Sequence, residues 1–167
     1  GGDILQIEAT RFTGKGRLVL TGQLGDVMKE SASIALDYVR THANEFKIDP
    51  KLFEENDVHI HVPEGAVPKD GPSAGVTMTT ALVSCFSNIP VKANLAMTGE
   101  VTLRGNVLPI GGLKEKSLAA HRSGIDTILI PKENVKDLDD VPQEVKDAVT
   151  FIPCSNVSQV LHNALVK

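Results

Sequence analysis

The segment Pro68–Gly75 (Pro-Lys-Asp-Gly-Pro-Ser-Ala-Gly) constrains the fold of this chain more than any other. Its prolines and glycines exclude regular helix or strand there and predict a loop. Residues 74–86 are small or apolar with no interior breaker, which predicts a buried helix. Ser73 therefore stands at a helix N-terminus, exposed and surrounded by free backbone N–H groups. A serine in that position is a candidate nucleophile beside a site for negative charge.

Length and composition predict one domain, residues 1–167, with a real hydrophobic core. Apolar residues make up 41% and charged residues 23%, as in ordinary globular proteins. The net charge of −4 gives no reason to expect nucleic acid or an anionic membrane as a partner. No apolar run approaches the ~20 residues that a transmembrane helix needs. The chain begins with Gly1 rather than Met and has no signal-peptide pattern, so we expect a fragment or a processed chain.

The two cysteines, Cys85 and Cys154, lie in apolar surroundings and have no CxxC spacing. This pattern favours buried free thiols over a disulfide or a metal site. Free thiols fit a reducing compartment.

Strand and helix patterns alternate irregularly along the chain, which predicts an α+β fold of mixed short sheets and helices rather than a doubly wound one. A turn at residues 14–16 joins the first two strands, and Asp26 is the expected N-cap of the first helix. We expect strands at 4–12, 17–21, 57–62, 95–98, 101–108 (with a turn at 105–106), 127–130 and 149–152, and helices from 26, at 74–86, 111–123 and 158–166.

Ser73 needs a group that takes its proton. None of the five histidines lies in a recognisable triad motif, and the GxSxG pattern is absent. A lysine is the other option, and it must be neutral to act as a base. Its pKa must therefore fall from ~10.4 towards ~7–8, which burial beside apolar walls can achieve.

Lys116 is the lysine that fits this role. Leu113, Lys116 and Ala120 are spaced i, i+3, i+7, so Lys116 falls on the apolar side of a helix opened by two glycines. Lys114 and Glu115 point more towards solvent. The alternative interpretation is an ordinary lysine whose stem packs on the helix while its ammonium reaches water.

The order of three motifs resembles the proteolytic domain of Lon proteases of the A-type branch. These are Pro68–Gly75, residues 97–105 (Met-Thr-Gly-Glu-Val-Thr-Leu-Arg-Gly) and Gly111–Lys116, and the similarity runs from Gly25 to Asn134. The resemblance implies the Lon proteolytic-domain fold, Ser73 as nucleophile and Lys116, the second lysine of Lys-Glu-Lys, as its base. The expected activity is that of a serine endopeptidase. By the helix-terminus argument, the N–H groups of Ser73 and Ala74 are the candidate oxyanion hole.

The resemblance also implies a larger protein around this chain. Its parts would be an ATP-driven unfoldase module, a substrate-binding N-terminal domain and a hexameric ring that degrades misfolded and regulatory proteins. The implied location is the cytoplasm, or alternatively an organellar matrix. No P-loop pattern occurs here, so ATP and magnesium are expected on the ATPase module and no cofactor in this chain. Two alternatives stay open: a non-catalytic or latent assembly domain, and a stand-alone, ATP-independent Lon-like peptidase.

Two further residues are candidates for supporting roles. Thr98 could accept a hydrogen bond from Lys116 and aim its amine at Ser73, or be an ordinary threonine at a strand end. Asp70 is expected to be the N-cap of the serine helix. It could instead control access to Ser73, or pair with Lys116 in an inactive state.

His59 and His61 share one strand face, a spacing that suits a metal ion. No third ligand is evident, so we expect polar packing near the cleft and no metal. Glu8, on the first strand, either lines the site or is a solvated strand glutamate.

Overall fold

The computed structural model describes residues 4–65 and 69–166, so Pro68 and the first three residues lie outside the described part. It confirms the α+β class. The helices are α1 (Asp26–Thr41), α2 (Lys51–Glu55), α3 (Gly75–Ser87), α4 (Leu113–Arg122), α5 (Gln143–Ala148) and α6 (Val157–Ala164), with 3-10 helices η1 (Ala43–Phe46) and η2 (Lys132–Asp140). The strands are β1 (Glu8–Thr13), β2 (Leu18–Thr21), β3 (Asn56–His61), β4 (Leu95–Met97), β5 (Glu100–Val101), β6 (Val107–Leu108), β7 (Thr127–Pro131) and β8 (Thr150–Cys154).

The first sheet has the order β1-β3-β2, with β3 antiparallel to β1 and parallel to β2. The two consecutive strands therefore do not pair with each other, although a turn joins them. Asp57, near the start of β3, explains this: its Oδ1 accepts hydrogen bonds from the N–H groups of Lys15 (3.0 Å) and Arg17 (2.8 Å). The turn thus wraps around the end of β3 instead of closing a hairpin.

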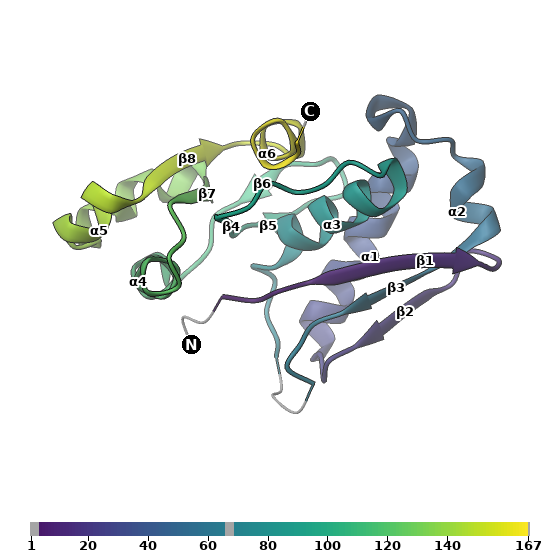
Figure 1. Cartoon of the computed structure of the whole chain (residues 1–167), viewed down its shortest axis with the longest axis horizontal. Coiled ribbons are helices and arrows are strands. Elements are labelled where there is room, and N and C mark those ends of the chain that lie inside the picture. The colour runs from purple at the N-terminus through teal and green to yellow at the C-terminus, as the bar shows by residue number, and fades with distance from the viewer. Residues whose placement is uncertain (1–3, 66–68, 167) are drawn as a thin grey trace.

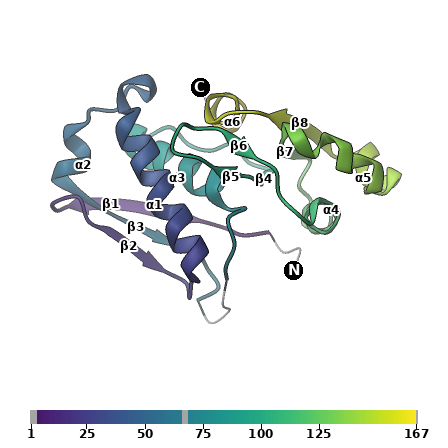
Figure 2. The same ribbon diagram turned by 180° about the vertical axis from the view of Figure 1, so that it is seen from behind.

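Helices α1 and α3 pack against each other on one side of this sheet (Figures 1 and 2). The apolar face of β3, carrying Val58 and Ile60, belongs to the same core as the buried sides of both helices. At one end of this core the rings of Phe53 and Phe86 stack with their centroids 4.3 Å apart.

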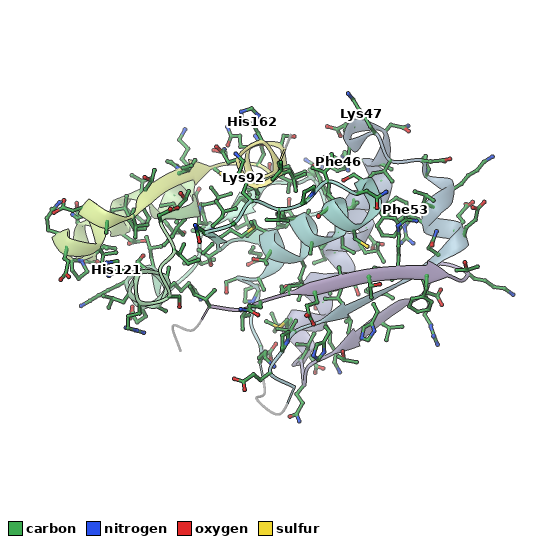
Figure 3. All side chains as sticks on the ribbon, in the orientation of Figure 1. Phe46, Lys47, Phe53, Lys92, His121 and His162 are labelled. Atoms are coloured by element: carbon green, nitrogen blue, oxygen red, sulfur yellow. The ribbon has the colours of Figure 1, made fainter. Side chains whose placement is uncertain are left out.

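The second sheet, β4-β7-β8, is parallel throughout and carries a second apolar cluster. Helices α4 and α5 and the 3-10 helix η2 pack around it. Its buried members are Leu113, Ala120, Ile128, Ile130, Val141, Val145 and Val149. Figure 3 shows that the two ends of the molecule are far apart: His121 of α4 lies towards one end of the long axis and Phe53 towards the other.

The residues before β1 connect the two clusters. Ile4 packs against the second cluster, whereas Leu5 and Ile7 pack against the first. This part of the chain was expected to be strand from residue 4, but the ladder with β3 begins only at Glu8.

Cys85 is half-buried and Cys154 is buried, and both are free thiols, as predicted. Burial raises the pKa of both thiols. Within residues 4–65 and 69–166, no helix combines the length and the apolar character needed to cross a membrane.

Candidate functional site

Ser73 lies in the loop that leads into α3 and is half-buried. The helix begins at Gly75, within a residue of the predicted start. In its first turns the buried Thr79 and Thr80 hydroxyls are satisfied within the helix, since they donate to the carbonyls of Gly75 and Val76 (both 2.8 Å).

Gly75 allows the serine loop to lie directly against the segment that follows β4. A Cβ at Gly75 would stand 2.9 Å from the backbone nitrogen of Val101, closer than real contacts allow. Two backbone hydrogen bonds use this proximity: Gly99 N–H donates to the Ser73 carbonyl (2.9 Å), and Val76 N–H donates to the Gly99 carbonyl (3.0 Å). The position of Ser73 is thus set by Gly99.

The N–H groups of Ser73 and Ala74 donate to no acceptor within the described residues. They precede the first turn of α3, where no helical carbonyl is available to them. Two adjacent free donors at a helix start are suited to stabilise an oxyanion. The geometry is therefore compatible with the prediction that the N–H groups of Ser73 and Ala74 form the oxyanion hole.

Thr98 is the residue whose environment differs most from that of an ordinary strand-end threonine. It is 6% exposed, and its N–H donates to the Leu129 carbonyl (3.1 Å), which extends the β4–β7 ladder by one residue. Its Oγ1 is buried and has no hydrogen-bond partner among the described residues. Buried hydroxyls are nearly always paired, so the Thr98 hydroxyl has the capacity to accept or donate one more hydrogen bond.

Strand alternation places the Thr98 side chain on the side of the second cluster. Along β4, Leu95 and Met97 pack against the first cluster, whereas Ala96 packs against the second. Side chains alternate along an extended chain, so Thr98 lies on the face of Ala96. Helix α4 contributes Leu113 and Ala120 to the same cluster.

Lys116 occupies the predicted side of α4. Leu113 and Ala120 of the same helix face are buried in the second cluster, and Lys116 between them is half-buried. Lys114 and Glu115 are exposed, as predicted. The helix face that carries Lys116 therefore borders the cluster that also holds Ile128 and Ile130 of β7.

No hydrogen bond joins Ser73 Oγ to Lys116 Nζ, and within the described part of the chain neither atom has a hydrogen-bond or ion-pair partner. The structure thus brings Ser73 next to Gly99, which follows Thr98, and places Lys116 on the half-buried side of α4. No hydrogen bond between the hydroxyl and the amine is formed in it.

Asp70 does not cap the serine helix, contrary to expectation. Its carboxylate accepts from the N–H groups of Met28 (2.9 Å) and Gly71 (2.9 Å), so it caps α1 instead. The physical reason is the route of the chain: Gly25 N–H donates to the Lys69 carbonyl (2.7 Å), which places Asp70 over the start of α1. The proposed Asp70–Lys116 pair is not formed either.

Asp70 also substitutes for the N-cap that was expected locally. Asp26 is the first residue of α1 rather than its cap, and the true N-cap, Gly25, has no side chain. The hydrogen bonds from Met28 and then Gly71 hold the pKa of the Asp70 carboxyl below its usual value.

His59 and His61 form a polar cluster with Thr21 on the outer face of the first sheet. The Thr21 hydroxyl lies 2.8 Å from His59 Nε2 and 2.6 Å from His61 Nδ1. Glu8 is exposed and directly opposite His61 in the β1–β3 register. Within the part of the chain that the structure describes, no hydrogen bond or ion pair links these residues to Ser73 or Lys116, and no group of three potential metal ligands occurs.

Asn134 is a residue of this region that the sequence reasoning did not single out. It is 2% exposed, and its amide bonds both backbone groups of Ile110, just before α4. An asparagine soon after the apolar β7 segment was the available signal in the sequence, but neither its burial nor its partner was deducible from spacing.

Comparison with known proteins gives one consistent family. Residues 1–167 match the family described as Lon protease (S16) C-terminal proteolytic domain. The chain is 60% identical over 167 residues to "Lon protease" of Brevibacillus choshinensis, covering 100% of this chain and 21% of that protein. It is 58% identical over 166 residues to "Lon protease 1" of Bacillus subtilis (strain 168), covering 99% of this chain and 21% of the relative. The chain therefore spans about a fifth of the length of the curated relatives that it matches.

Proposed function

Since this chain belongs to the Lon protease proteolytic-domain family, we propose that it is the peptide-cleaving module of an ATP-dependent protease, with Ser73 as nucleophile and Lys116 as base. The module would act as a serine endopeptidase on misfolded and regulatory proteins.

The unpaired Thr98 hydroxyl is the observation that carries this proposal. It is buried and adjacent to the Gly99 that holds Ser73, and strand alternation places it on the side of the cluster to which α4 contributes. An amine hydrogen of Lys116 is the donor that would satisfy it. A lysine has a long, flexible side chain, so rotation about its own torsions suffices to deliver the amine.

In the proposed reaction, neutral Lys116 takes the hydroxyl proton as Ser73 Oγ attacks the peptide carbonyl carbon. The N–H groups of Ser73 and Ala74 stabilise the resulting oxyanion. Lys116 then gives its proton to the leaving amine, and the C–N bond breaks to leave an acyl-enzyme. Water activated by the same lysine hydrolyses the ester and regenerates the serine.

The remaining parts of the proposal concern the longer protein. ATP and magnesium would be bound by a separate ATPase module, and the assembled form would be a homo-oligomer, a hexameric ring. Its substrates would be unfolded polypeptides, and its location the cytoplasm or an organellar matrix. On these grounds, the chain alone should cleave unstructured peptides weakly and without ATP.

The test is hydrolysis of a fluorogenic peptide by the wild-type chain, with and without nucleotide, and by Ser73→Ala and Lys116→Ala. Both variants should lose cleavage while keeping the circular dichroism spectrum of the wild type. Lys114→Ala is the matched control, because Lys114 is an exposed lysine on the same helix. A folded Lys116→Ala variant that retains most of its activity would exclude the dyad.

The unmade Ser73–Lys116 contact favours a second candidate, a latent assembly domain. Acylation of Ser73 distinguishes the active protease from the latent assembly domain. Covalent labelling of Ser73 by a serine-reactive reagent supports the protease, and an unlabelled Ser73 in assembled protein supports the latent domain.

A further inference from the structure

Asn134 makes an unusually complete set of contacts for a side chain outside the catalytic residues. Its Oδ1 accepts from the N–H of Ile110 (2.9 Å), and its Nδ2 donates to the carbonyl of the same residue (2.8 Å). The second hydrogen of Nδ2 goes to Asp137 Oδ2 (2.7 Å). The amide thus binds Ile110 as a neighbouring strand would, by both of its backbone groups.

Ile110 controls where α4 begins. It lies two positions before Gly112, the N-cap of α4, which has φ of 76° and provides no side-chain cap. The N–H of Lys116 donates to the Gly112 carbonyl (3.1 Å), so Lys116 sits in the first turn fixed by that loop. The bonds from Asn134 hold the loop just before the helix, where no capping side chain bonds the first N–H groups of α4.

Asn134 connects this helix start to the strand that also holds Thr98. It follows β7 after Pro131, and the Leu129 carbonyl of β7 accepts from Thr98 N–H. Thr98 is followed by Gly99, which holds Ser73. The segment of Thr98 and Gly99, which holds Ser73, is thus bonded to β7, and the loop before the helix of Lys116 is bonded to η2, which follows β7 in the chain.

We propose that Asn134 is a positioning residue for Lys116: by clamping Ile110 it sets the position of α4 relative to β7, and so the approach of the Lys116 amine to Thr98 and Ser73. The proposal rests on the proposed function, since it presumes that Lys116 is the base. Asn134 itself contacts neither the substrate nor the reacting atoms.

The expected effect is on the chemical step. Misplacing a reacting group by about 1 Å can cost about 100-fold in rate. Replacing Asn134 frees the loop without removing a reacting group, so we expect Asn134→Ala to lower kcat roughly 10- to 100-fold and to leave KM within about twofold.

The test measures peptide cleavage per active site, with the number of sites titrated by a serine-reactive acylating reagent. Asp137→Asn alters the third partner of the amide and leaves the clamp on Ile110. Val145→Ala weakens the second cluster without touching the loop. A merely structural role of Asn134 would lower the number of titrated sites in Asn134→Ala and Val145→Ala alike, with the rate per site unchanged.

Hydrogen exchange at the amides of Ile110 and Lys116 provides a readout that needs no activity. We expect faster exchange at both amides in Asn134→Ala and wild-type exchange in Asp137→Asn. If Asn134→Ala does not fold, Asn134→Leu serves instead, because it keeps the volume of the side chain, removes its hydrogen bonds to Ile110 and places no charge beside Asp137.

The outcomes separate the two proposals. An inactive wild type or an active Lys116→Ala variant overturns the dyad. An inactive Lys116→Ala, together with an Asn134 variant whose rate per site stays within twofold of wild type, overturns the positioning role alone. Unchanged exchange at Ile110 and Lys116 in the Asn134 variant overturns it as well.

Discussion

Replacing Thr98 with valine separates the stability of this domain from its proposed chemistry. Valine matches threonine in shape, so Thr98→Val removes the buried, unpaired hydroxyl and leaves no cavity. Most substitutions in a core lower both stability and activity. Here we expect the variant to be at least as stable as the wild type and yet slower.

The magnitudes follow from the environment of the hydroxyl. A buried polar group without a partner costs about 1–3 kcal/mol, so its removal should raise the free energy of unfolding by up to that amount. For a domain of this size each kcal/mol corresponds to about 2–4 °C in Tm. The hydrogen bond that Lys116 would give to Thr98 is worth about 1 kcal/mol, so kcat/KM should fall roughly fivefold.

The assay pairs chemical denaturation with fluorogenic peptide cleavage. Thr80→Val is the matched control: Thr80 is equally buried, but its hydroxyl already donates to the Val76 carbonyl. That variant should lose about 0.5–1.5 kcal/mol of stability and keep its rate. The reasoning is refuted if Thr98→Val is destabilised as much as Thr80→Val, or if it cleaves peptide at the wild-type rate.

Three other perturbations test the surroundings of the site. Asp70→Asn removes the charge that caps α1. Hydrogen bonds from Met28 and Gly71 lower the pKa of Asp70 in the folded state. The carboxylate therefore stabilises the fold fully above its unfolded pKa of about 3.9, and this stabilisation is lost as the pH falls through the folded-state pKa. The stability difference from wild type should therefore narrow in acid, as followed by denaturation at a series of pH values. Gly75→Ala places a Cβ 2.9 Å from the backbone nitrogen of Val101 and should cost about 1–3 kcal/mol of unfolding free energy. Burial raises the pKa of the Cys85 thiol, so iodoacetamide at pH 8 should alkylate it more slowly than an exposed cysteine in an unfolded peptide, as followed by mass spectrometry.

Local patterns in the sequence determined a large part of this fold. The break at Gly71-Pro72 and the apolar run after it located α3, and the alternation of residues 57–62 located β3. The spacing of Leu113, Lys116 and Ala120 identified the buried side of α4. These features depend on neighbours within one or two turns, and periodicity reports such neighbours directly.

The short elements after β7 were not predicted. Both η2 and α5 are brief, charged segments, and their apolar residues are too few to show a period. They form because Val141 and Val145 reach the second cluster, a contact that depends on the completed sheet.

Partners distant in the chain were decided by the tertiary structure alone. Asp70 was expected to cap the helix beside it, but it caps α1, whose Met28 is 42 positions away. Residues before and after the turn at 14–16 were expected to be neighbouring strands, but β3 lies between them. A carboxylate satisfies whichever N–H groups folding brings near it, and sequence spacing carries no information about that choice.

The candidate site also has features that the local sequence determined and contacts that only the tertiary structure decided. The sequence identified a serine at a helix start and a lysine on an apolar helix face, because each depends on its own local segment. It could not show that Gly99 holds Ser73, that the Thr98 hydroxyl is buried without a partner, or that Asn134 clamps the loop before α4. These contacts exist only once β4 and β7 are paired, since that pairing places the three segments against one another.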